Sequence, residues 1–191
     1  MMMPNDSISG RGDLSILFIA EHSIWGLLGY QSALAFSSRV APIFWCAGDP
    51  TPPLLESWRG DWILSFKSDL ILKGDSLARA SRGAVNFHPG PPKYRGVGGY
   101  YWALRNRDAE YGVTSHFMVD RIDFGPIVDF QPFRLSPAET VSSLRFRTAV
   151  FLLAQLNSLL VKIASNETLV TTDIQWSPHL YTYSELRNAQ E

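Results

Sequence analysis

The sequence contains a single cysteine, Cys46, among its 191 residues. One thiol excludes an internal disulfide and a cysteine-rich zinc site. Cys46 lies inside the apolar run "APIFWCAG", and free cysteines are among the most buried residue types. We therefore expect a buried structural thiol and no function that depends on cysteine chemistry.

The chain also lacks an excess of charge of either sign. It has 17 lysines and arginines against 18 aspartates and glutamates, which gives a formal net charge of −1. Proteins that bind nucleic acid usually carry a basic excess on the binding domain. Nucleic acid is therefore not expected as a partner.

Hydrophobic segments of the kind that target a chain to a membrane are missing as well. The first twelve residues, "MMMPNDSISGRG", have no apolar segment preceded by basic residues, as a secretory signal would have. The most apolar region, "AVFLLAQLNSLLVKIA" (149–164), is interrupted by Gln155 and Asn157 and is shorter than the roughly 20 residues that a membrane span needs. We expect a flexible N-terminus over residues 1–12, no membrane association and a cytoplasmic location.

What the sequence does contain is an alternation of short apolar runs and helical patterns. Continuous apolar runs are typical of strands buried on both faces, and apolar residues three and four apart indicate helices. Strands are predicted over 14–21, 40–48, 61–66 and 83–88, with further strands over 112–120 and 126–135. Helices are predicted over 23–39, 74–81, 98–108 and 136–164, the last capped by Ser136.

This order of elements predicts an α/β fold. Alternating strands and helices form an open, mostly parallel sheet with helices on both faces. The expected organisation is one core over residues 13–165, which ends in a long C-terminal helix, followed by a tail over 166–191 that packs on the core.

Polar side chains follow two of the predicted strands. Asn86 and His88 end the strand 83–88 and, being two residues apart, point to the same face. Asp120 and Asp123 follow the next strand, so either carboxylate could hold the imidazole protonated. An amide and an imidazole can stabilise negative charge on a carbonyl oxygen. On these residues alone a purely structural hydrogen-bonded pair stays possible, and for His116 we favour a structural or supporting role.

The segment "VNFHPGPPKYRGVGGYYWALRNRDAEYGVTSHFMVDRIDFGPIV" (85–128) resembles the catalytic core of the formyltransferases that use 10-formyltetrahydrofolate. It contains their Asn-x-His-Pro, Tyr-x-Gly and Gly-Val-Thr-x-His elements in order. The resemblance is strong over residues 61–135 and weaker over 13–60, where the N-terminal half is one β–α unit short. The loop "PPKYRGVGG" and the tail "WSPHLYTYSEL" are most similar to those of sugar N-formyltransferases.

The resemblance implies a role for individual residues. The catalytic residues would be Asn86, His88 and Asp123, with the first two on the formyl oxygen and the third assisting proton transfer. The co-substrate 10-formyltetrahydrofolate would be bound by Leu70, Ile71, Leu72, Val119 and Asp120. The acceptor would contact Lys93, Tyr94, Arg95, Gly96 and Trp102. No metal is implied.

The expected activity is formyl transfer to the amine of a small molecule, with a nucleotide-linked amino sugar favoured, by a chain that could form a homodimer. Three alternatives stay open: a 10-formyltetrahydrofolate hydrolase, a relative of methionyl-tRNA formyltransferase and a non-catalytic folate-binding module. The near-neutral charge disfavours a tRNA substrate. The presence of all three catalytic residues disfavours a binding module.

Overall fold

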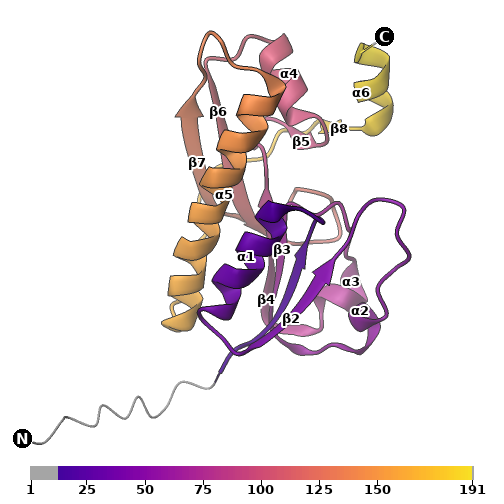
Figure 1. Ribbon diagram of the computed structural model, residues 1–191, viewed down its shortest axis with the longest axis vertical. Helices are drawn as coiled ribbons and strands as arrows, with labels where there is room; N and C mark the ends of the chain where they lie inside the picture. Colours follow the sequence, from indigo (N-terminus) through magenta and orange to yellow (C-terminus); the bar gives the residue numbers. More distant parts are fainter. Residues whose placement is uncertain (1–12, 191) are drawn as a thin grey trace, which may run out of the picture.

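The computed structural model describes residues 13–190, and its centre is a six-stranded sheet (Figure 1). The strands are β1 (Ser15–Ala20), β2 (Arg39–Phe44), β3 (Gly60–Phe66), β4 (Ala80–His88), β6 (Glu110–Phe117) and β7 (Ile127–Arg134). They lie in the order β2-β1-β3-β4-β6-β7, in which the first four are parallel and the last two antiparallel. This is the predicted open, mostly parallel α/β sheet. The predicted flexible N-terminus, residues 1–12, lies outside the described residues.

Helices cover both faces of the sheet, as predicted. The helices are α1 (Ile24–Leu34), α2 (Leu54–Ser57), α3 (Gly74–Leu77), α4 (Gly99–Arg105) and α5 (Val141–Ala164). Along β1 successive side chains alternate between the faces: Phe18 joins the core beneath α1 and α5, and Leu17 joins the core beneath α2. Because both faces are covered, β1 is buried along its whole length.

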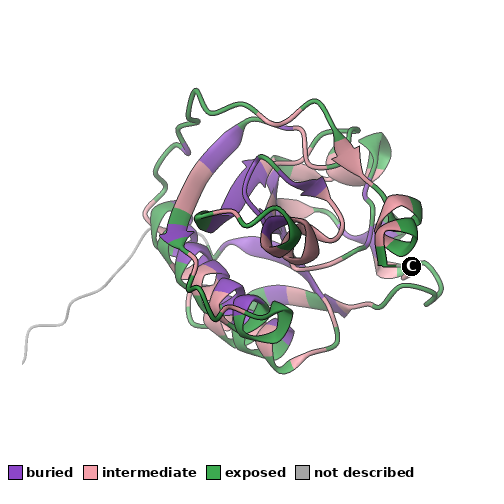
Figure 2. Ribbon diagram, turned by 90° about the horizontal axis from the view of Figure 1, so that it is seen from above, coloured by how far each residue is buried: buried purple, intermediate pink, exposed green. Residues whose placement is uncertain are grey.

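The longest helix, α5, is the predicted C-terminal helix, but it begins one turn later than expected. Its cap is Thr140, whose hydroxyl accepts from the Ser143 N–H at 3.1 Å while Ser143 bonds back to the Thr140 N–H. The predicted cap, Ser136, instead closes a separate turn with Glu139. By length and composition α5 could cross a membrane, with a mean hydropathy of 1.3. Its apolar stripe is buried against the sheet, as Figure 2 shows along one side of the helix, so α5 is a core helix here.

The N-terminal half is short between β2 and β4. The four-residue helix α2 is the only helix between β2 and β3, and α3 is also four residues long, where a helix over 74–81 was predicted. The prediction of a buried Cys46 is wrong, because β2 ends at Phe44 and Cys46 lies in an exposed turn. There its N–H donates to Asp49 Oδ2 at 2.8 Å.

The chain after α5 returns along the core as a C-terminal segment, residues 172–190. It contains β8 (Leu180–Tyr181), which pairs in parallel with β5 (Arg95–Gly96), and ends in α6 (Tyr183–Gln190). Figure 1 shows α6 beside α4, at the end of the molecule remote from the N-terminus, and Figure 2 shows that it is largely exposed. The C-terminal segment therefore lies near the carboxyl end of β4.

Candidate active site

A cavity of about 620 Å³ lies beyond the carboxyl ends of β3 and β4. Most of the residues that line it come from the ranges 67–72, 86–89, 96–101, 118–123 and 180–183. This is where open α/β sheets bind their ligands. Asn86, His88 and Asp123 all lie in its wall.

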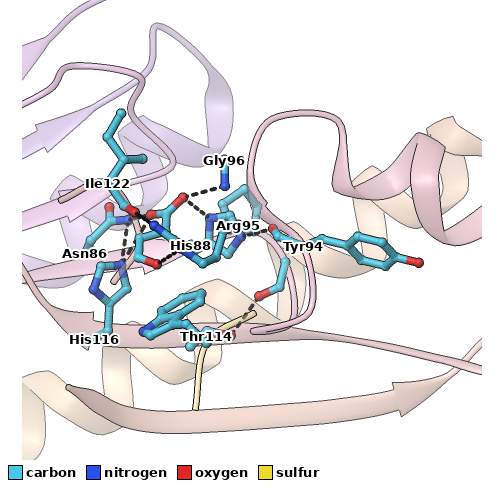
Figure 3. A network of polar contacts seen from close by, with 12 residues as sticks. Asn86, His88, Tyr94, Arg95, Gly96, Thr114, His116 and Ile122 are labelled. Carbon is cyan, nitrogen blue, oxygen red and sulfur yellow. Dashed lines mark hydrogen bonds and ion pairs between the residues drawn. The ribbon is translucent and has the colours of Figure 1, made fainter. Parts of the chain in front are cut away.

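The carboxylate of Asp123 contacts four partners of a polar network, and Figure 3 labels these partners: Asn86, His88, Gly96 and His116. Its Oδ2 lies 3.2 Å from His88 Nδ1 and accepts from the Gly96 N–H at 3.0 Å. Its Oδ1 accepts from Asn86 Nδ2 at 3.2 Å and lies 3.4 Å from His116 Nε2. The structure thus brings the three predicted catalytic residues together and adds His116 as a fourth.

The fold explains why these side chains meet. Asn86 and His88 share one face of β4, while Phe87 between them packs in the core. Asn86 lies directly opposite His116 in the antiparallel pair of β4 and β6, where facing side chains are about 5 Å apart. Asp123 follows β6 in a turn, where its φ of +42° aims the carboxylate back toward β4.

Asp123 is kept charged by its neighbours. Burial alone raises the pKa of this carboxyl, but the adjacent His88, the hydrogen bond and charge of His116 and the Gly96 N–H together outweigh burial. The pKa of Asp123 is therefore held below its ordinary value. A buried carboxylate that stays ionised at neutral pH can accept hydrogen bonds from both imidazoles.

Each nitrogen of the His88 ring has a contact within the protein. Its Nε2 lies 2.9 Å from the backbone oxygen of Tyr94, and because a carbonyl oxygen only accepts, Nε2 must carry a hydrogen. Its Nδ1 faces the carboxylate of Asp123, so a doubly protonated ring would donate to both. The contacts of Asp123 with His88 and Asn86 are 3.2 Å long, beyond the about 2.7–2.9 Å of tight charge-assisted bonds. Such contacts in a free enzyme can tighten or exchange when substrate binds.

His116 takes part in the same network. Its Nδ1 contacts the Phe117 carbonyl oxygen at 2.8 Å and so carries a hydrogen, which leaves Nε2 facing Asn86 and Asp123. The two imidazoles contact the carboxylate itself, and within residues 13–190 no three His, Cys, Asp or Glu side chains are arranged to hold a metal ion. The motif Gly-Val-Thr-x-His was the only sequence signal for this residue.

The segment predicted to bind the folate lines the same cavity. Leu70 and Leu72 are buried in the core beneath α2, whereas Ile71 is 56% exposed. Within residues 13–190, neither Ile71 nor Leu72 makes a hydrogen bond through its backbone N–H. Two unused backbone donors at the cavity wall suit a ligand that carries hydrogen-bond acceptors.

Val119 and Asp120 line the cavity too. Asp120 Oδ1 accepts from the Gly74 N–H at 2.8 Å and so ties this loop to the start of α3. It is Asp123, and not Asp120, that contacts the imidazole of His88.

The structure separates the residues predicted to bind the acceptor. Only Gly96 lines the cavity; Lys93, Tyr94, Arg95 and Trp102 do not. Tyr94 is 1% exposed and its hydroxyl donates to Asp108 Oδ2 at 2.6 Å, while Lys93 forms an ion pair with the same carboxylate. These side chains support the loop from behind.

Other aromatic and apolar side chains, which the sequence analysis did not predict as acceptor contacts, line this part of the cavity. They are Tyr100 and Tyr101 from α4, with Leu180, Tyr181, Tyr183 and Leu186 from the C-terminal segment. The sequence showed only that the tail is rich in aromatic residues. The four side chains of the C-terminal segment reach the cavity because β8 pairs with β5.

Comparisons with known proteins agree with this geometry. A family model described as "Formyl transferase" matches residues 54–155, more than half of the chain. The chain therefore belongs to the formyl transferase family. It is an enzyme of one-carbon group transfer.

Solved structures share the fold. An N-formyltransferase from Helicobacter canadensis, in complex with folinic acid and dTDP-3-aminofucose, is 21% identical with a TM-score of 0.73, over 88% of this chain and 71% of that one. A 4-N formyltransferase from Francisella tularensis is 15% identical with a TM-score of 0.76, over 93% and 80%. WlaRD, a sugar 3N-formyl transferase solved with dTDP and 5-N-formyl-THF, is 19% identical with a TM-score of 0.74, over 91% and 72%.

Proposed function

We propose that the protein transfers the formyl group of 10-formyltetrahydrofolate to the amine of a nucleotide-linked amino sugar. The observation that carries the proposal is the contact of Asn86 and His88 with the ionised Asp123 in the wall of one cavity. The Helicobacter canadensis protein was solved with folinic acid and dTDP-3-aminofucose, and WlaRD with 5-N-formyl-THF and dTDP; these ligands support the choice of both substrates.

In the proposed reaction the acceptor nitrogen attacks the formyl carbon, and negative charge develops on the formyl oxygen. Asn86 Nδ2 is the donor most easily redirected to this oxygen, because both of its present contacts are 3.2 Å long. His88 provides the second donor by exchanging one of its two protein contacts. Removing one donor to such an oxyanion typically costs about 3–4 kcal/mol of barrier.

The reaction also requires a proton to move. A bond forms between the acceptor nitrogen and the formyl carbon, the bond from that carbon to the folate nitrogen breaks, and one proton passes from the acceptor nitrogen to the folate nitrogen. Asp123 and His88 together supply a group that can take and return this proton. The hydrogen on His88 Nε2, which faces the Tyr94 carbonyl oxygen, is the donor that His88 can offer to the developing oxyanion.

The two substrates would occupy different ends of the cavity. The backbone N–H groups of Ile71 and Leu72, with Leu70 beside them and Val119 and Asp120 opposite, suit the folate ring system. The acceptor would lie against the Gly96 loop and the tyrosines of α4 and the C-terminal segment. Lys93, Tyr94, Arg95 and Trp102 would then act on acceptor binding through the loop they support.

A formyl-transfer assay tests the proposal. The protein is incubated with 10-formyltetrahydrofolate and a panel of amines that includes dTDP- and UDP-linked amino sugars, free amino sugars and methionyl-tRNA. Mass spectrometry then detects the gain of one formyl group, with Asp123→Asn as the inactive control. We expect formylation of a nucleotide-linked amino sugar. Formate release without any acceptor would instead indicate a hydrolase, and folate binding without turnover would indicate a binding module.

A homodimer and a cytoplasmic location stay predictions from the sequence. Sedimentation velocity at several concentrations tests the first. Cell fractionation tests the second.

A further inference from the structure

Trp176, in the C-terminal segment, packs against both imidazoles of the site. Its ring centroid lies 5.7 Å from that of His88, at an interplanar angle of 73°, and 4.9 Å from that of His116, at 82°. Both contacts are edge-on, a preferred geometry between aromatic rings. The indole is half-buried and does not belong to the cavity wall, so it touches the two histidines from behind.

The same side chain contacts the turn that carries the carboxylate. Trp176 Nε1 donates to the Gly125 carbonyl oxygen at 2.8 Å. Gly125 follows Asp123 by two residues, so one indole touches His88, His116 and the backbone that places Asp123. No other residue of the described chain bridges these three parts through one aromatic side chain.

Arg95 holds this arrangement together from the other side. The residue is 2% exposed, and its guanidinium donates to backbone carbonyl oxygens of two segments. Nε and Nη2 reach Asp123 and Ile122 at 2.7 and 2.8 Å, as Figure 3 shows beside the network. Nη1 reaches Ser177, the neighbour of Trp176, at 3.1 Å. The Asp123 turn and the backbone at Trp176 are therefore tied to one buried cation.

We propose that Trp176 is a positioning residue of the active site, which fixes the ring orientations of His88 and His116 toward Asp123. This inference rests on the proposed function. Each ring has one short bond to a backbone carbonyl oxygen, from His88 Nε2 to Tyr94 at 2.9 Å and from His116 Nδ1 to Phe117 at 2.8 Å. The other nitrogen of each ring faces Asp123 at 3.2 Å or more. Because the terminal torsion of a histidine is broad, each ring can still tilt about its one short bond. Packing behind the rings removes that freedom. A misplacement of about 1 Å in a reacting group can cost about 100-fold in rate.

Kinetics of two substitutions separate ring packing from the hydrogen bond. Trp176→Leu keeps an apolar side chain, although a smaller one, and removes the ring. We expect kcat to fall about 10- to 100-fold. KM for both substrates should change less than about twofold, because Trp176 does not line the cavity. Trp176→Phe keeps a ring and loses the bond to Gly125, and should recover most of kcat. Trp45→Ala is the control, since Trp45 bonds only its own turn through Nε1 and should leave kcat unchanged.

Proton NMR of the histidine rings tests positioning without any turnover. Loss of the indole ring current in Trp176→Leu should move the ring signals of His88 and His116 and leave those of His22 in place. The inference is overturned if the folded variant keeps the kcat of the wild type, and equally if these ring signals stay in place. If Trp176→Leu does not fold, Trp176→Phe carries the test, because the smaller ring must shift both signals by itself. Absence of formyl transfer by the wild type would contradict the proposed function instead, and the NMR comparison would still decide on Trp176.

Discussion

The two walls of the cavity are built in different ways. The wall that carries Asn86 and His88 is the end of β4, a strand whose last residues lie in the core of the sheet. The opposite wall is the C-terminal segment, with the two-residue strand β8 and the helix α6, which has no buried residue. Rigid elements hold reacting groups more accurately than loops do. Under the proposed function, the first wall would carry the chemistry and the second would recognise the acceptor.

A few side-chain contacts keep the second wall in place. Tyr183 Oη donates to Asp69 Oδ2 at 3.1 Å, across the cavity from α6 to the loop after β3. Arg95 ties Ser177 to the Asp123 turn. The pairing of β8 with β5 adds backbone contacts. A surface segment that joins the sheet only through so short a strand can differ in sequence without disturbing the sheet, which suits the part of a site that meets a variable substrate.

The largest expected effect comes from Asp123→Asn, because this carboxylate contacts Asn86 and both imidazoles of the site. The change nearly preserves shape and removes the charge that both imidazoles face. We expect kcat and kcat/KM to fall together by about 1,000-fold, measured in the formyl-transfer assay, with folding checked by thermal melts. A folded Asp123→Asn protein with more than a tenth of the wild-type kcat would contradict the role of Asp123.

A smaller effect is expected in the loop after β3, where the folate is proposed to bind. Leu72→Pro removes the backbone N–H that has no partner within residues 13–190, so folate affinity should fall about tenfold, as for one lost hydrogen bond. Leu72→Met, which keeps the N–H and a similar volume, is the matched control. Fluorescence titration with a folate measures both variants. Unchanged folate affinity in a folded Leu72→Pro protein would show that the folate does not bind at this segment.

The smallest effect is expected at the second wall. Gly98 has φ of +78°, and a Cβ there would lie 2.9 Å from a methyl group of Leu186 in α6. Gly98→Ala should displace α6 and raise the acceptor KM about fivefold, with kcat and folate affinity nearly unchanged. Gly48→Ala is the control: Gly48 also has positive φ, +102°, but nothing lies within 4 Å of its Cβ position. An equal acceptor KM for Gly98→Ala and Gly48→Ala would show that α6 does not take part in acceptor recognition.

The same contrast explains what the sequence could predict. Strand β1 and most of β3 are continuous apolar runs, so the sequence could predict them. The spacing of Asn86 and His88 placed both side chains on one face of β4. The contact of His116 with Asn86 depends on the register between β4 and β6, which no local pattern specifies. The capping error at Ser136 arose because two hydroxyl residues, Ser136 and Thr140, both precede a helical pattern.

The second wall was harder to predict for a physical reason. Strand β8 has two residues and exists because Arg95 and Gly96 pair with it from far along the chain. Tyr94, in a loop, and Trp102, in the short helix α4, lie near the site in sequence. Neither segment is long enough to show a periodicity, and both side chains pack away from the cavity. Trp176 lies 60 residues beyond His116 in the chain numbering, so only the three-dimensional arrangement shows their contact.

Kinetics of His88→Ala with both substrates test the central claim most directly. If the end of β4 carries the chemistry, the loss appears in the transition state and not in ground-state binding. The account predicts a fall of about two to three orders of magnitude in kcat and in kcat/KM, with KM for the folate and the acceptor nearly unchanged in a protein that melts as the wild type does. Formylation of the acceptor by His88→Ala at near wild-type kcat would contradict it.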